Sequence, residues 1–235
     1  MRIAFSLIII LFGTLSPLKG VLARVYEVNV TDRSIVADGA LFGPYGTYER
    51  LKGTIVFKFD PENEKNWNII DLEYAPLDDS GMVTATANFM VLQPSDPILR
   101  RELGFLEISN RGRKLAMPYF NAAEINSSDP IEHEHLGDGL LLRQGLTIVW
   151  VGWQYDIPQN DVNMWLDTPR IQDGSNSIKG LVRSDWVIKG LTPSLSLGHR
   201  GSPAYYLVDD ITSPNNVLTY REERNGARTI IPKNL

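Results

Sequence analysis

The stretch that decides the fold runs from residue 104 to residue 156. It begins with Gly104-Phe-Leu-Glu-Ile-Ser109, a short apolar segment, followed by the polar turn Asn110-Arg-Gly-Arg-Lys114. It ends with Gly145-Leu-Thr-Ile-Val-Trp-Val-Gly-Trp-Gln-Tyr-Asp156. Residues 146–151 are continuously apolar, as in a strand that is covered on both faces. Two such strands around a helix predict parallel pairing through a right-handed crossover.

The helix of this unit is expected over Leu136 to Gln144. Apolar residues recur there at helical spacing, and Gly145 suits a helix C-cap. Gly137 and Gly139 lower the helix propensity. The sequence therefore predicts strand, turn, short helix and buried strand in that order.

Short strands dominate the remaining chain: residues 69–74 and 83–91 have the period-two pattern of half-buried strands, and 54–59 is a β-branched and aromatic run. Asp78-Asp-Ser-Gly81 has the composition of a hairpin turn, and Asn225-Gly226 is a strong two-residue hairpin signal. The expected strands cover Arg24 to Val30, Thr54 to Phe59, Ile69 to Tyr74, Val83 to Val91, Leu181 to Ile188, Ala204 to Val208, Val217 to Glu222 and Arg228 to Ile231. The fold class is α/β and rich in β-structure, with one strand–helix–strand unit and extensive additional antiparallel strands.

Composition excludes several classes of function. A net charge of −5 argues against a nucleic-acid partner, and Arg111, Arg113 and Lys114 form the only tight basic group. The chain has no cysteine, which excludes disulfides and thiolate chemistry. We expect no metal or other cofactor. His133 and His135 are two residues apart, and a third ligand would have to come from His199 or Asp138.

The N-terminus has the layout of a secretory signal peptide. Arg2 precedes a short apolar run, and Val21-Leu-Ala23 places small residues before a cleavage site. We expect cleavage after residue 23, a single β-rich domain over 24–235, and a periplasmic or secreted location. The alternative is an uncleaved N-terminal anchor. No later segment is apolar enough to span a bilayer, so no stable span is expected after cleavage.

Four motifs in the same order resemble the N-terminal region of a family of bacterial α/β-hydrolase-domain proteins. Two of them are the segments 110–114 and 145–156 quoted above. The others are Val36-Ala-Asp-Gly39 with Phe42-Gly-Pro-Tyr-Gly-Thr-Tyr-Glu-Arg-Leu-Lys-Gly53, and Leu218-Thr-Tyr-Arg-Glu-Glu-Arg-Asn-Gly-Ala-Arg-Thr-Ile-Ile-Pro232. The resemblance covers nearly all of the chain after the signal peptide. It implies a partial α/β-hydrolase sheet that stops before the nucleophile elbow.

The resemblance also implies roles for individual residues. In this fold, one donor of the oxyanion hole comes from the loop after the first strand of the unit, so the backbone N–H of Arg111 or Gly112 is the candidate here. Asn110, Trp153 and Gln154 are the candidates for substrate binding, because ligands bind beyond the carboxyl ends of such strands. The alternative for the turn is a plain glycine turn in which Arg113 and Lys114 are solvated charges. The alternative for the tryptophans is that Trp150 lies in the core and Trp153 packs under a loop.

No catalytic residue is convincing. The chain has no Gly-x-Ser-x-Gly motif, and no serine lies between an apolar strand and a helix. The serines considered are Ser109, Ser194, Ser196 and Ser202, with His199 as the nearest base. The first hypothesis is that the chain is the N-terminal part of an exported esterase or acyl-hydrolase and is inactive alone. Its expected partners are a C-terminal hydrolase half or a second copy of the chain, and its expected ligand is a small ester-like molecule. The second is an exported β-rich binding or assembly module without catalysis.

Overall fold

The computed structural model describes residues 23–124, 129–173, 176–177, 180–192, 195 and 210–232. The chain divides into two compact units, 1–178 and 179–235, and each is described by itself below. The expectation of a single domain over 24–235 stays a prediction. Among the described residues, none of the helices has the length and apolar character needed to cross a membrane.

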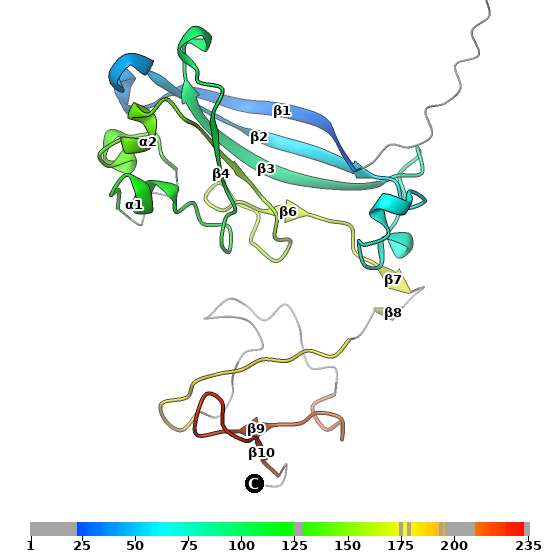
Figure 1. Cartoon of the computed structure of the whole chain (residues 1–235). Helices are drawn as coiled ribbons and strands as arrows, with labels where there is room; N and C mark the ends of the chain where they lie inside the picture. Colours follow the sequence, from blue (N-terminus) through cyan, green and yellow to red (C-terminus); the bar gives the residue numbers. More distant parts are fainter. Residues whose placement is uncertain are drawn as a thin grey trace, which may run out of the picture. The chain divides into compact units, whose positions relative to one another are not determined.

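The first unit is built on a mixed six-stranded sheet with the order β1-β2-β3-β5-β4, and β6 pairs with β3 (Figure 1). The strands are β1 (Arg24–Ile35), β2 (Tyr48–Phe59), β3 (Val83–Pro94), β4 (Gly104–Glu107), β5 (Thr147–Val151) and β6 (Leu166–Asp167). Strands β1, β2 and β3 form a long antiparallel meander. The β-branched run over 54–59 and the alternating pattern over 83–91 therefore predicted real strands. The structure begins the first earlier, at Tyr48, and continues the second to Pro94.

The parallel pair that the sequence predicted is confirmed. Strand β4 pairs in parallel with β5, with Gly104 opposite Thr147 and Glu107 opposite Trp150. Strand β5 pairs antiparallel with β3 and so joins this unit to the meander. Three antiparallel pairs followed by one parallel pair thus make a single mixed sheet.

The helix expected over 136–144 is shorter than predicted. It consists of a 3₁₀ turn η6 (His133–Leu136) and one α-turn α2 (Leu140–Arg143), preceded by the short helix α1 (Ala116–Phe120). Gly137 and Gly139 have φ angles of +58° and +70°, which no helix accommodates. Gly145 ends the helix as predicted, with φ +70° and the Tyr45 ring packed where a Cβ would lie.

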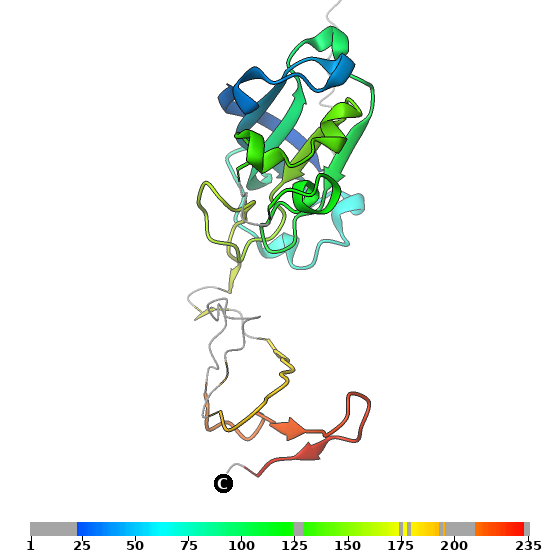
Figure 2. The same cartoon turned by 90° about the vertical axis from the view of Figure 1, so that its left-hand side faces the viewer.

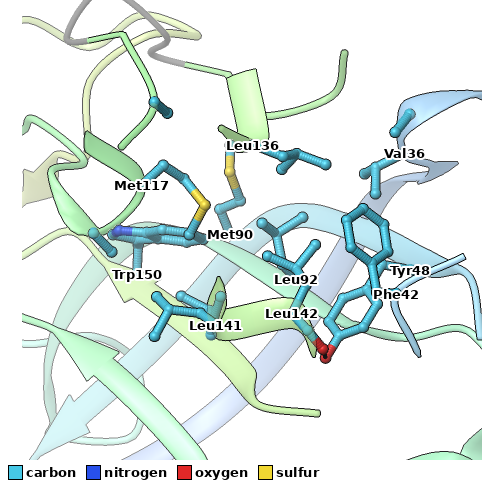
Figure 3. Packing of buried hydrophobic residues seen from close by; sticks show 14 of the residues in the cluster. Val36, Phe42, Tyr48, Met90, Leu92, Met117, Leu136, Leu141, Leu142 and Trp150 are labelled. Carbon is cyan, nitrogen blue, oxygen red and sulfur yellow. Dashed lines mark hydrogen bonds between the residues drawn. The ribbon is translucent and has the colours of Figure 1, made fainter. Parts of the chain in front are cut away.

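The hydrophobic core lies between one face of the sheet and these helices (Figure 3). Trp150 of β5 and Met90 and Leu92 of β3 point from the sheet toward Met117 and Leu142. Helices α1 and α2 lie together over one end of the sheet (Figure 1). The buried hydroxyl of Tyr48 donates to the carbonyl of Leu142 over 2.9 Å, which ties β2 to α2.

The strand predicted over Ile69 to Tyr74 is wrong. These residues enter the 3₁₀ turn η4 (Leu72–Tyr74) after Asp71, whose φ is +59°. Leu72 packs with Ala75 and Val83 in a small second cluster, while Ile70 is 85% exposed. An alternating pattern makes a strand only where a neighbouring strand offers hydrogen bonds, and none pairs here. The turn at 78–81 therefore leads into β3 rather than joining two strands.

Four further 3₁₀ turns lie in the connections: η1 (Ala37–Gly39), η2 (Gly43–Tyr45), η3 (Glu64–Asn66) and η5 (Pro97–Leu99). The first unit ends in a short antiparallel pair, β7 (Gln172–Asp173) and β8 (Asn176–Ser177).

The second unit contains the predicted C-terminal hairpin. Strands β9 (Thr219–Tyr220) and β10 (Thr229–Ile230) pair antiparallel (Figure 2). Their loop is longer than the two-residue turn that the sequence suggested, since the Gly226 N–H donates to the carbonyl of Glu223 inside it. The strand predicted over 181–188 is not formed, and the one over 204–208 lies outside the described residues.

Candidate functional site at the carboxyl ends of β4 and β5

The candidate site is where the chain leaves β4 and β5. Because these strands are parallel, residues 108–115 and 152–156 emerge at the same edge of the sheet, where open α/β sheets bind ligands. After β4 the chain makes a tight turn in which Arg111 and Gly112 have φ angles of +55° and +75°. The Arg113 N–H donates to the carbonyl of Asn110 over 3.3 Å and closes this turn. We call residues 110–113 the strand-end turn.

The structure brings three of the predicted site residues together. The Arg111 N–H donates to Oε1 of Gln154 over 2.8 Å, and the Trp153 indole N–H donates to the carbonyl of Ser109 over 2.6 Å. The Arg111 guanidinium pairs with the Asp156 carboxylate. Asn110 is exposed at the tip of the turn and Trp153 is 51% exposed. The strand-end turn is thus held to the loop after β5 by charge and hydrogen bonds.

The engaged Arg111 N–H limits what this site can do as it stands. An oxyanion hole needs N–H donors directed at the place where negative charge develops. The Gln154 side chain already accepts this N–H, so a substrate oxygen would have to displace an amide oxygen. Such a displacement exchanges one hydrogen bond for another.

Gly112 is buried and has a packing role. A Cβ at this position would lie 2.8 Å from Cγ2 of Ile157 and 2.9 Å from the carbonyl oxygen of Met164. The Gly112 carbonyl accepts the Met164 N–H over 2.8 Å. The glycine therefore allows the segment 157–164 to pack directly on the strand-end turn.

Glu107 is the residue that sequence reasoning missed. Its carboxylate accepts the N–H groups of Leu115 and Ala116 over 2.6 and 2.7 Å, and it also accepts the Trp150 indole N–H. One side chain thereby accepts the N–H groups at the start of α1 and holds the indole of the core tryptophan. The sequence does contain an indication of this role, because Glu107 is the only charged residue within the apolar segment 104–109.

Lys114 is not the solvated charge that the plain-turn interpretation assumed. It is 5% exposed, and its ammonium donates to the carbonyl of Val162 over 2.6 Å. Burial is the main cause that lowers the pKa of Lys114 to about 8, since removal from water disfavours the charged form. Arg113 next to it is exposed, as expected.

The other candidates for catalysis and metal binding do not converge in the described residues. Ser109 is completely buried, and its hydroxyl has no hydrogen-bond partner among them. Ser194, Ser196, His199 and Ser202 lie outside the described part of the chain. Within that part, no group of three acidic or histidine side chains is placed to hold a metal ion. His135 accepts the Glu132 N–H through Nδ1 and so has a capping role in η6.

Comparisons of the chain with protein-family models, with curated proteins and with solved structures found no match.

Proposed function

We propose that this chain supplies the oxyanion side of an exported α/β-hydrolase of the esterase or acyl-hydrolase type and is inactive on its own. The observation that carries the proposal is the parallel β4–β5 pair whose carboxyl-end loops are joined by Arg111–Gln154 and Trp153–Ser109 contacts. A turn directly after a central strand is where this fold places one oxyanion donor. The order β2-β3-β5-β4, with only the last pair parallel, is also compatible with the start of such a sheet.

The nucleophile, base and acid would come from a polypeptide segment that pairs with the free edge of β4. Among the described strands, β4 is the last in the sheet. Leu106 and Ile108 beside this edge are 59% and 66% exposed. A parallel strand placed there would bring its own carboxyl end next to the strand-end turn, which is the position a nucleophile needs.

The face of the sheet opposite the core carries a row of apolar side chains. Val28, Ile55 and Ala87 lie side by side across β1, β2 and β3, and Val25 and Phe57 continue the row. Val25 and Val28 on the edge strand β1 are each 54% exposed, whereas Ala87 on β3 is completely buried. Because an antiparallel meander can leave one face to water, this row by itself does not require a further layer.

The proposal is tested with p-nitrophenyl butyrate as substrate. The purified 235-residue chain should show no turnover above the uncatalysed rate. Its tagged, exported form should co-purify from its own cells with a polypeptide containing a Gly-x-Ser-x-Gly segment, and the pair should hydrolyse the ester. Rapid hydrolysis by the chain alone, abolished by Ser109→Ala, would show that the nucleophile is already present.

A binding or assembly module is the second candidate. It is favoured by the Arg111 N–H, which is already engaged by Gln154 and not presented to a ligand. This candidate predicts no hydrolase partner in the co-purification and no Gly-x-Ser-x-Gly segment in the DNA immediately downstream. The same experiment therefore separates the two functions.

A further inference from the structure

A cavity of about 380 Å³ lies on the core side of the sheet, apart from the strand-end turn. Lys52 and Thr54 of β2, Asn88 of β3 and Lys114 line it. From the segment that follows β5 it is lined by Gln159, Asn160, Asp161, Met164 and Trp165. None of Asn110, Arg111, Gly112, Trp153 and Gln154 lines it. The cavity is therefore a second candidate site, independent of the proposed hydrolase function.

Two ammonium groups line this cavity, and their charges are balanced differently. Lys52 pairs with Asp129 over 3.3 Å, and Asp129 also pairs with the buried Arg50. Lys114 has no acidic side chain within ion-pair distance among the described residues. Its only strong acceptor is the carbonyl of Val162, because the second contact is to a thioether sulfur. One buried ammonium is thus left with a positive charge and a hydrogen-bond donor to satisfy.

The other lining residues define the rest of the ligand. Phe89, Met90, Met164 and Trp165 contribute to the wall, so an apolar tail has a place to pack. Asp161 also lines the cavity, and it would repel a ligand carrying several negative charges. Charge and shape together fit a ligand with one negative charge and a short apolar chain.

We infer that this cavity binds a small organic monocarboxylate, with the carboxylate held between the ammonium groups of Lys52 and Lys114. The carboxylate supplies the missing counter-charge and accepts the remaining Lys114 N–H. The aliphatic part lies against the thioether and indole groups of the wall. No bond is made or broken, so this is a binding site.

The pH dependence of binding follows from Lys114. Its pKa is lowered to about 8 by burial and by the charges of Lys52 and Arg50, while Asp129 and Glu107 act in the opposite direction. The ammonium is charged at pH 6.5 and largely neutral at pH 9.5. A bound carboxylate stabilises the charged form, so it raises the pKa of Lys114, and by linkage binding weakens as the pH rises.

The test uses sodium butyrate and its uncharged analogue butyramide, with binding to the full chain followed by NMR chemical shifts. We expect butyrate to bind with a Kd on the order of 1 mM, because a ligand of six heavy atoms has little surface through which to gain binding free energy. Binding should weaken roughly tenfold or more between pH 6.5 and pH 9.5. Butyramide should bind much more weakly at both values, and butyrate should raise the pKa of Lys114 measured at its Cε.

Variants decide whether the two lysines hold the ligand. Lys52→Met and Lys114→Met should each weaken butyrate binding at least tenfold. Lys58→Met is the matched control, because Lys58 is also on β2 but pairs with Asp78 away from the cavity. If Lys114→Met fails to fold, Lys52→Met still decides. The inference is overturned if Lys52→Met keeps the wild-type affinity for butyrate, or if butyramide binds as well as butyrate. It is also overturned if the affinity does not depend on pH, or if no binding is seen at about 50 mM butyrate.

Discussion

Replacing Gly112 by alanine tests whether this glycine is required for packing. Its φ of +75° costs an L-residue about 1–2 kcal/mol. The new Cβ would also lie 2.8 Å from Ile157 and 2.9 Å from the carbonyl of Met164. Overpacking of this kind typically adds about 1–3 kcal/mol. Gly112→Ala should therefore lower the free energy of unfolding by about 2–5 kcal/mol.

Gly81→Ala is the matched control for this variant. Gly81 has a φ of +76°, and nothing lies within 4 Å of the position its Cβ would take. It therefore has the same backbone cost and the same change in the unfolded chain without the collision. Urea unfolding followed by tryptophan fluorescence should place the midpoint of Gly112→Ala about 1 M below that of Gly81→Ala. Equal midpoints would refute the packing role. A bulky residue at 112 would consequently unfold the site rather than report on an oxyanion donor.

Three further predictions concern pH, a buried amide and export. The pKa of Asp78 is lowered mainly by its hydrogen bond to Lys58. The ionised carboxylate therefore stabilises the folded chain fully above about pH 4, and this contribution is lost as the pH falls. The difference in urea midpoint between wild type and Asp78→Asn should shrink between pH 7 and pH 3. Asn121→Ala removes the acceptor of the buried Leu141 N–H and should lower the free energy of unfolding, measured in urea, by about 1–3 kcal/mol. A decrease of less than about 0.5 kcal/mol would count against this role. N-terminal sequencing of the exported protein should begin at Arg24, and a mature protein that starts at Met1 would contradict cleavage after Ala23.

Local sequence pattern was sufficient where a segment's own residues dictate its conformation. The apolar segments 104–109 and 146–151 predicted the parallel pair, because a short apolar run that meets a second one across a helix has few other ways to pair. The strand over 83–91 followed from strict alternation, which buries one row of side chains. Gly145 was also predicted correctly, because a positive φ at a helix end is a local requirement.

Only the tertiary structure decided which polar groups are buried and what they meet. The segment 69–74 alternates like a strand, yet it has no strand to pair with and turns instead. The sequence predicts Lys114 as a surface charge, but the segment 157–164 packs over it and leaves its ammonium at the wall of a cavity. Glu107 acquires three hydrogen-bond donors from residues up to 43 positions away. Such contacts depend on the packing of distant segments, and no pattern within one segment contains that information.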